Sequence, residues 1–71
     1  MTLSLKDYRV LRGLSVTGLG RLVGVHRVEI WRWETGRRVP SLPHLVRLAR
    51  VLGASLDELV QPLPPLEEWP G

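Results

Sequence analysis

The segment from Leu14 to Pro40 reads LSVTGLGRLVGVHRVEIWRWETGRRVP and is the most informative part of this chain. The spacing of its apolar residues predicts two short helices, at about residues 16–23 and 27–35. Gly24 marks the turn between these helices, and residues 37–40 follow the second helix as a loop rich in arginine. The segment is therefore expected to form a pair of helices joined by a tight turn.

The second of these helices has two chemically different sides. Ile30 and Trp33 share the apolar side, which suits a core. The opposite side is a stripe at i, i+1, i+4 and i+5 spacing, made of Arg27, Val28, Trp31 and Arg32. A helix with one buried side and arginines on the other suits insertion into the major groove of DNA.

Three further helices are expected from capping signals on either side of this segment. The first helix is expected to start at Ser4 or Thr2 and to end at Gly13. The next runs from Ser41 to Gly53, and the last starts at Ser55, with Glu58 completing a capping box, and ends near Val60. The chain shows no strand pattern. It is therefore expected to be all-α, a five-helix bundle with a central helix-turn-helix.

The length of 71 residues suits a single domain. We expect this helix-turn-helix domain at residues 1–61. Residues 62–71 are rich in proline and carry no periodicity, so this C-terminal tail is expected to be extended or loosely ordered. The tail is also a candidate contact for a protein partner.

The charge of the chain is distributed unevenly. The formal net charge is +3, but all ten basic residues lie between Lys6 and Arg50, where three acidic residues leave a net charge of +7. Nine of the ten basic residues are arginine, whose planar fork of donors suits phosphate groups and guanine edges. A GC-rich genome would also favour arginine over lysine, but it would not explain where the arginines lie. The charge pattern points to a nucleic-acid partner.

Several functional classes are excluded by what the sequence lacks. The chain has no cysteine, which rules out disulfides and thiolate metal sites and fits a reducing cytosol. It shows neither a secretory signal nor an apolar run of the roughly 18 residues that a membrane span needs, so a cytoplasmic location is expected. His26 and His44 are isolated, and no acidic pair converges. We expect no catalytic residue, no metal and no cofactor.

A set of ordered residues runs through most of the chain, namely Arg9, Arg12-Gly13-Leu14-Ser15, Leu19, Gly24-Val25, Ile30, Trp33-Glu34-x-Gly36, Arg38, Pro40-Ser41-Leu42, Leu48-Ala49, Leu52-Gly53 and Leu56. This set resembles the Cro/Xre-type helix-turn-helix family of phage repressor-like regulators. The resemblance covers about Leu3 to Val60. It implies a lambda-repressor-like five-helix fold and sequence-specific binding of double-stranded DNA, usually by a homodimer on a palindromic operator.

The base-reading positions of the family fall on Arg27, Val28 and Arg32 of this chain. Arg27 can pair with a guanine edge through two hydrogen bonds, worth about 1–3 kcal/mol of discrimination. Arg32 can do the same or hold a phosphate, and the methyl groups of Val28 suit a thymine methyl. The alternative for each arginine is a solvated surface charge.

Further residues are expected at the DNA backbone. Thr17 can donate its hydroxyl to a phosphate. Arg37 and Arg38 follow the second helix as phosphate contacts, with a solvated charge pair as the alternative. His26 lies where the family often has Ser or Thr on a phosphate, and an inert exposed histidine is its alternative. Trp31 can pack on sugar and phosphate, contact another protein, or simply lie on the surface. Glu29 can pair with Arg32, accept from a cytosine amino group, or point to solvent.

The resemblance also implies a structural ion pair between Arg9 and Glu34, which would tie the first helix to the end of the third. The sequence departs from the family at four points. Gly20 stands where Ala is usual, a mild change that lets the next helix approach closely. Apolar residues replace polar ones at the other points, which are Val10 with Leu11, Val16 and Trp31.

Two functions are compatible with these observations. The first is a DNA-binding transcriptional regulator, most simply a dimeric repressor. The second is a protein-interaction module on the same fold, such as the antitoxin of a toxin–antitoxin pair. The apolar departures favour the interaction module, whereas the arginines of the second helix and the following loop favour the regulator.

Overall fold

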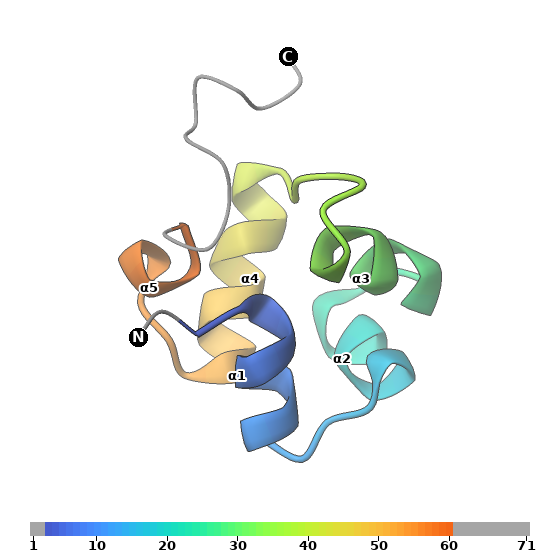
Figure 1. The fold of residues 1–71 in the computed structure, drawn as a ribbon, viewed down its shortest axis with the longest axis horizontal. Coiled ribbons are helices and arrows are strands. Elements are labelled where there is room, and N and C mark those ends of the chain that lie inside the picture. Colours follow the sequence, from blue (N-terminus) through green and yellow to red (C-terminus); the bar gives the residue numbers. More distant parts are fainter. Residues whose placement is uncertain (1–2, 61–71) are drawn as a thin grey trace.

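The computed structural model describes residues 3–60, and in that range the chain forms helices and connecting turns without a strand (Figure 1). The helices are α1 (Leu5–Leu11), α2 (Val16–Val23), α3 (Arg27–Glu34), α4 (Leu42–Leu52) and α5 (Leu56–Val60). The expected all-α fold with five helices is therefore confirmed. The predicted boundary at residue 61 and the tail at residues 62–71 lie outside the described residues.

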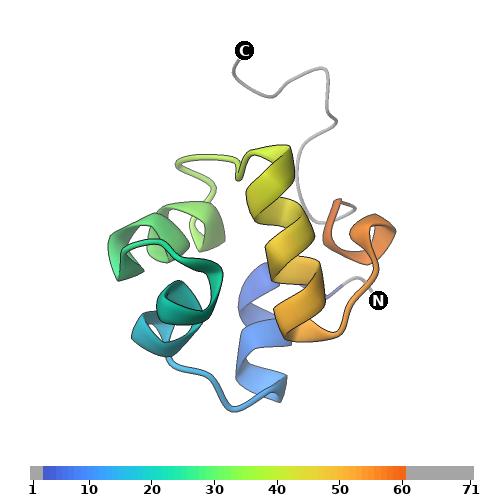
Figure 2. The same cartoon turned by 180° about the vertical axis from the view of Figure 1, so that it is seen from behind.

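Helix α4 occupies the centre of the molecule. Figures 1 and 2 show α2 and α3 on one side of it, α5 on the other, and α1 across one face. The helix pairs that pack against each other are α2 with α3, α2 with α4, α4 with α5, and α1 with α3. Because α3 packs only on its inner side, its outer side is left at the molecular surface.

The core is built from the apolar sides that the periodicity indicated. Leu19 of α2, Ile30 of α3 and Leu48 of α4 have no exposed surface. The buried apolar residues are Leu5, Leu19, Val23, Ile30, Trp33, Leu45, Leu48, Leu52 and Leu59. Val16, which stands where the family has a polar residue, is half-buried against this cluster.

The turn between α2 and α3 depends on two glycines. Gly24 has φ +89°, a left-handed conformation that disfavours any residue with a side chain. Gly20 lies where α2 meets this turn, and a Cβ there would come within 2.7 Å of the carbonyl oxygen of Val25. The absence of a side chain at residue 20 is therefore what lets the turn approach α2 so closely.

Two helix ends differ from what the sequence indicated. Ser41 precedes α4 as expected, but its side chain makes no capping hydrogen bond. The Ser41 hydroxyl instead lies 2.9 Å from Nδ1 of His44, one turn into the helix. Helix α3 ends at Glu34 rather than Thr35, which is its C-cap residue and whose hydroxyl donates to the carbonyl oxygen of Trp31 at 2.8 Å.

Candidate nucleic-acid interface

Helix α3 presents an exposed ridge formed by Arg27, Val28, Trp31 and Arg32, here called the α3 ridge. Val28 is 39% and Trp31 46% exposed. On the opposite side of the helix, Ile30 and Trp33 anchor it in the core. The helix is thus fixed by one side and accessible by the other.

His26 begins α3 as its N-cap residue. Its ring nitrogen Nδ1 accepts a hydrogen bond from the backbone N–H of Val28 at 3.1 Å. In the neutral ring the proton must then reside on Nε2, which leaves one N–H donor for an outside acceptor. This capping role was not anticipated from the sequence, although the position just before a helix was a signal for it.

Glu29 joins two arginines of the interface. Its Oε2 accepts a hydrogen bond from Nη1 of Arg32 at 3.3 Å, and its Oε1 lies 3.6 Å from Nη1 of Arg38. Glu29 was expected to pair with Arg32, to accept from a cytosine or to point to solvent, and in the structure it pairs with Arg32. The second partner, Arg38, comes from the loop after α3 and was not anticipated.

Trp31 and Arg37 form a second surface contact. The guanidinium carbon of Arg37 lies 4.8 Å from the centre of a Trp31 ring, within the range of a cation–π interaction. Trp31 therefore lies on the molecular surface beside a positive charge. Thr17, in the first turn of α2, is also exposed.

Arg9 and Glu34 lie together beneath the end of α3. Nε of Arg9 donates to Oε2 of Glu34 at 2.6 Å, and Nη2 donates to Oε1 at 3.1 Å. A further hydrogen bond runs from Nη1 of Arg9 to the carbonyl oxygen of Leu14 at 2.9 Å. These contacts connect α1, the following loop and the end of α3.

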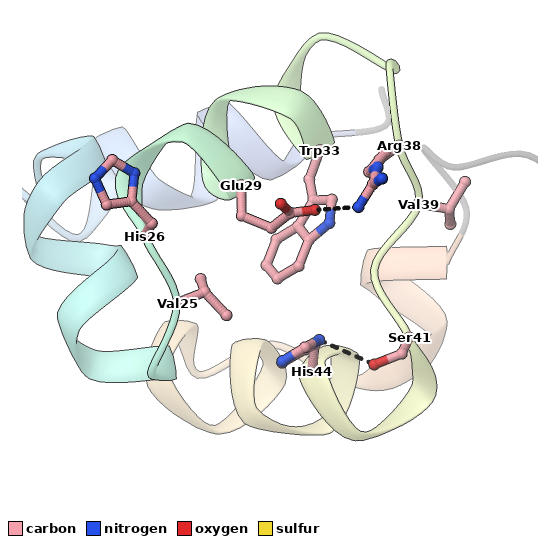
Figure 3. Close-up of a pocket in the computed structure, with 8 residues that line it drawn as sticks. All are labelled: Val25, His26, Glu29, Trp33, Arg38, Val39, Ser41 and His44. Atoms are coloured by element: carbon pink, nitrogen blue, oxygen red, sulfur yellow. Dashed lines mark hydrogen bonds and ion pairs between the residues drawn. The ribbon is translucent and has the colours of Figure 1, made fainter.

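An open depression of about 660 Å³ lies between α3, the loop that follows it and the start of α4 (Figure 3). The indole of Trp33 points into it, and the ring of His44 packs against that indole at 5.4 Å between ring centres. The depression is lined by Val25, His26, Glu29, Trp33, Arg38, Val39, Ser41 and His44. It brings His26 and Arg38, two of the expected backbone contacts, to one side of the molecule.

A family model described as a helix-turn-helix domain matches residues 3–63. The chain belongs to this family and is of the Cro/Xre type. Membership indicates a DNA-binding regulator. None of the curated proteins compared with the chain matches it.

Within the helix-turn-helix, α2 and α3 are the two helices of the motif and Gly24 lies in its turn. In this motif the second helix enters the major groove while the first crosses the backbone. The α3 ridge belongs to that second helix.

Some arginines of the helix-turn-helix domain also donate hydrogen bonds within the fold, which the charge pattern did not indicate. Nε of Arg12 donates to the carbonyl oxygen of Leu52 at 2.7 Å, and Nη1 of Arg47 donates to that of Val23 at 3.2 Å. These oxygens end α4 and α2, where cations and donors are favourable. Together with Arg9, these arginines hold helices together, and of the three only Arg9 is largely covered, while Arg12 and Arg47 stay exposed.

The described residues offer neither a cluster of metal-ligating side chains nor a membrane-spanning helix. Among residues 3–60, no group of three or more His, Cys, Asp or Glu side chains is arranged to hold a metal ion. Over the same range, no helix is long and apolar enough to cross a membrane.

Proposed function

We propose that this protein is a sequence-specific regulator of transcription that inserts α3 into the major groove of double-stranded DNA. The observation that carries this proposal is the α3 ridge, which is exposed on a helix whose other side is fixed in the core. Arg27, Val28 and Arg32 are the proposed base-reading residues. Arg27 stands at the start of α3, where recognition helices of this motif reach base edges.

The proposed contacts to the DNA backbone surround this ridge. Thr17 lies in the first turn of α2, and His26 caps α3 with one ring nitrogen left to donate. The other proposed backbone contacts are Trp31 on α3 and Arg37 and Arg38 in the loop that follows it. The guanidinium group of Arg37 lies over the ring of Trp31. Phosphate contacts of this kind position a protein on the duplex and make its affinity depend on salt.

The proposal includes a homodimer that acts as a cytoplasmic repressor on a palindromic operator. A single small module buries little surface on DNA and binds weakly, whereas two copies one helical turn apart add their contacts. Repression then follows from occupying the operator. Sedimentation of the protein with and without a palindromic duplex measures the number of copies bound.

Selection of duplexes from a random pool tests the proposal most directly. A regulator enriches one motif, and a two-fold repeat within that motif supports the dimer. Arg27→Ala and Arg32→Ala are expected to weaken binding to the enriched duplex, each relaxing preference at a separate base position. Arg50→Ala, on the exposed surface of α4, is the matched control. Failure to bind any duplex at low salt overturns the proposal.

The exposure of Val10 and Leu11 favours a second candidate, a protein-interaction module. These α1 side chains are 58% and 70% exposed and stand where the family has charged residues. An interaction module would bind a protein through such a face and would leave random duplexes unbound at low salt. Titrating the protein with a random duplex at low salt therefore separates the two candidate functions.

A further inference from the structure

The carboxylate of Glu29 lies between two cations that come from different elements. Arg32 belongs to α3, one turn further along, while Arg38 belongs to the loop after α3. The distances are 3.3 Å from Oε2 to Arg32 and 3.6 Å from Oε1 to Arg38, so each oxygen faces one guanidinium group. Figure 3 shows the side chain of Glu29 directed toward Arg38 across the depression.

The three side chains differ in their exposure. The side chain of Glu29 is 23% exposed, whereas those of Arg32 and Arg38 are 43% and 64% exposed. The carboxylate is thus less exposed than the two guanidinium groups that it faces. This is the arrangement of an anion held at a surface between two guanidinium groups, and a phosphate diester has the same charge and similar oxygen spacing.

We propose that Glu29 is an internal competitor of DNA: its carboxylate occupies Arg32 and Arg38 in the free protein and is displaced on binding, from Arg38 by a phosphate group and from Arg32 by the base edge or phosphate group that Arg32 contacts. The proposal rests on the proposed function, since it names the same arginines as DNA contacts. Forming the DNA contacts of these arginines then requires breaking their pairs with Glu29. The binding free energy gained from the contacts is therefore smaller than the charges of the arginines suggest. Glu29 lowers the affinity for duplexes of every sequence, because the phosphate contact of Arg38 is independent of sequence.

The expected size of the effect follows from the exposure of the pairs. Exposed ion pairs are weak, so the carboxylate is a competitor that DNA can displace. Removing it frees two cations and also removes a negative charge that repels the duplex. Glu29→Gln is therefore expected to tighten binding to a random duplex by about threefold to thirtyfold at moderate salt.

The test is a fluorescence-anisotropy titration of a labelled random duplex at fixed salt. Asp57→Asn is the matched control, because Asp57 is exposed on α5 and its removal changes the net charge by the same amount. The control is expected to change affinity by less than about twofold, since exposed charges more than a Debye length apart are largely screened. Glu29→Ser removes the carboxylate in a second way, should the glutamine variant fold poorly.

A double-mutant cycle separates competition from a general effect of charge. In an Arg38→Ala background, Glu29→Gln is expected to give a smaller gain in affinity than it gives in the wild type, because one of the two competed cations is gone while the pair with Arg32 remains. Circular dichroism checks that all variants keep their helical content.

The outcomes distinguish this inference from the proposed function. If the wild type binds duplexes and Glu29→Gln binds them equally or more weakly, Glu29 is not a competitor and the inference is overturned. The inference is also overturned if Asp57→Asn raises the affinity for DNA as much as Glu29→Gln does. The same holds if Glu29→Gln raises the affinity as much in the Arg38→Ala background as in the wild type. A wild-type protein that binds no duplex overturns the proposed function itself, and the inference with it.

Discussion

Arg9 and Glu34 face each other through two hydrogen bonds, of 2.6 Å and 3.1 Å, although one residue lies in α1 and the other ends α3. Their side chains are 11% and 7% exposed, so water replaces neither contact easily. The pair lies at the opposite end of α3 from the cap of His26. It therefore holds the end of the helix that the motif's turn does not hold.

Replacing Glu34 by Gln should destabilise the protein more than it changes the sequence preference for DNA. The substitution leaves the guanidinium group of Arg9 buried without a counter-charge, at an expected cost of about 2–3 kcal/mol. Urea unfolding at low temperature measures this loss. Glu29→Gln is the control, since its exposed pairs should contribute less than about 1 kcal/mol each. An unfolding midpoint unchanged by Glu34→Gln would contradict a structural role for the pair.

Gly20→Ala should destabilise the turn between α2 and α3, contrary to the mild change that the family pattern suggested. Alanine gains about 1 kcal/mol over glycine in a helix. The added Cβ, however, would lie 2.7 Å from the oxygen of Val25 and 3.3 Å from the nitrogen of Arg27. Moving backbone atoms costs about 1–3 kcal/mol in a packed site, so the net change is an expected loss of about 1 kcal/mol.

The matched control for this substitution is Gly18→Ala in the same helix. A Cβ at residue 18 meets side-chain atoms only, with Oγ of Ser15 at 3.1 Å as the nearest. A hydroxyl can move more readily than a backbone carbonyl, so Gly18→Ala should be neutral or stabilising in urea unfolding. If Gly20→Ala proves the more stable of the two variants, the close approach of the turn is not a constraint.

His26 should be replaceable by another capping residue without loss of stability. Its Nδ1 accepts from the N–H of Val28, as a serine hydroxyl at an N-cap would. His26→Ala should therefore lower the free energy of unfolding by about 1 kcal/mol, while His26→Ser should restore it. Equal stability of the alanine and serine variants would show that the cap contributes nothing. DNA affinity measured on the serine variant then isolates the contribution of the ring nitrogen Nε2.

Helix positions were predictable from local signals. Gly13, Gly24 and Gly53 were expected to end helices or turn the chain, and all three have positive φ. Ser4 and Asp7 form a capping box: the N–H of Asp7 donates to the Ser4 hydroxyl at 3.1 Å, and the N–H of Ser4 donates to the Asp7 carboxylate at 2.8 Å. Such signals act over three or four residues, so they can be recognised without knowledge of the tertiary structure.

The partners of the arginines were not predictable in the same way. Arg12 caps the end of α4, and Arg47 caps the end of α2, because packing brings helices together that are far apart in the sequence. The pair of Glu29 with Arg38 depends on how the chain turns after Gly36. From sequence alone, an arginine that meets DNA and one that closes a helix end look alike.

The Tyr8 hydroxyl, which donates to Oε2 of Glu58 at 3.0 Å, should titrate above its ordinary range. Burial raises the pKa of this hydroxyl above its ordinary value of 10.0, and the hydrogen bond to Glu58 and the charge of Glu58 raise it further. The folded state thus favours the protonated form. This contribution to stability is complete below pH 10 and is lost as the pH rises through the raised pKa.

Tyr8 is the only tyrosine in the chain, so the near-ultraviolet absorbance of tyrosinate reports this one group. The native protein should show a higher titration midpoint than the same chain in concentrated urea. Glu58→Gln should lower the native midpoint, because it removes the negative charge while keeping an acceptor. A native midpoint equal to that of the denatured chain would show that α1 and α5 do not hold Tyr8 and Glu58 together in solution.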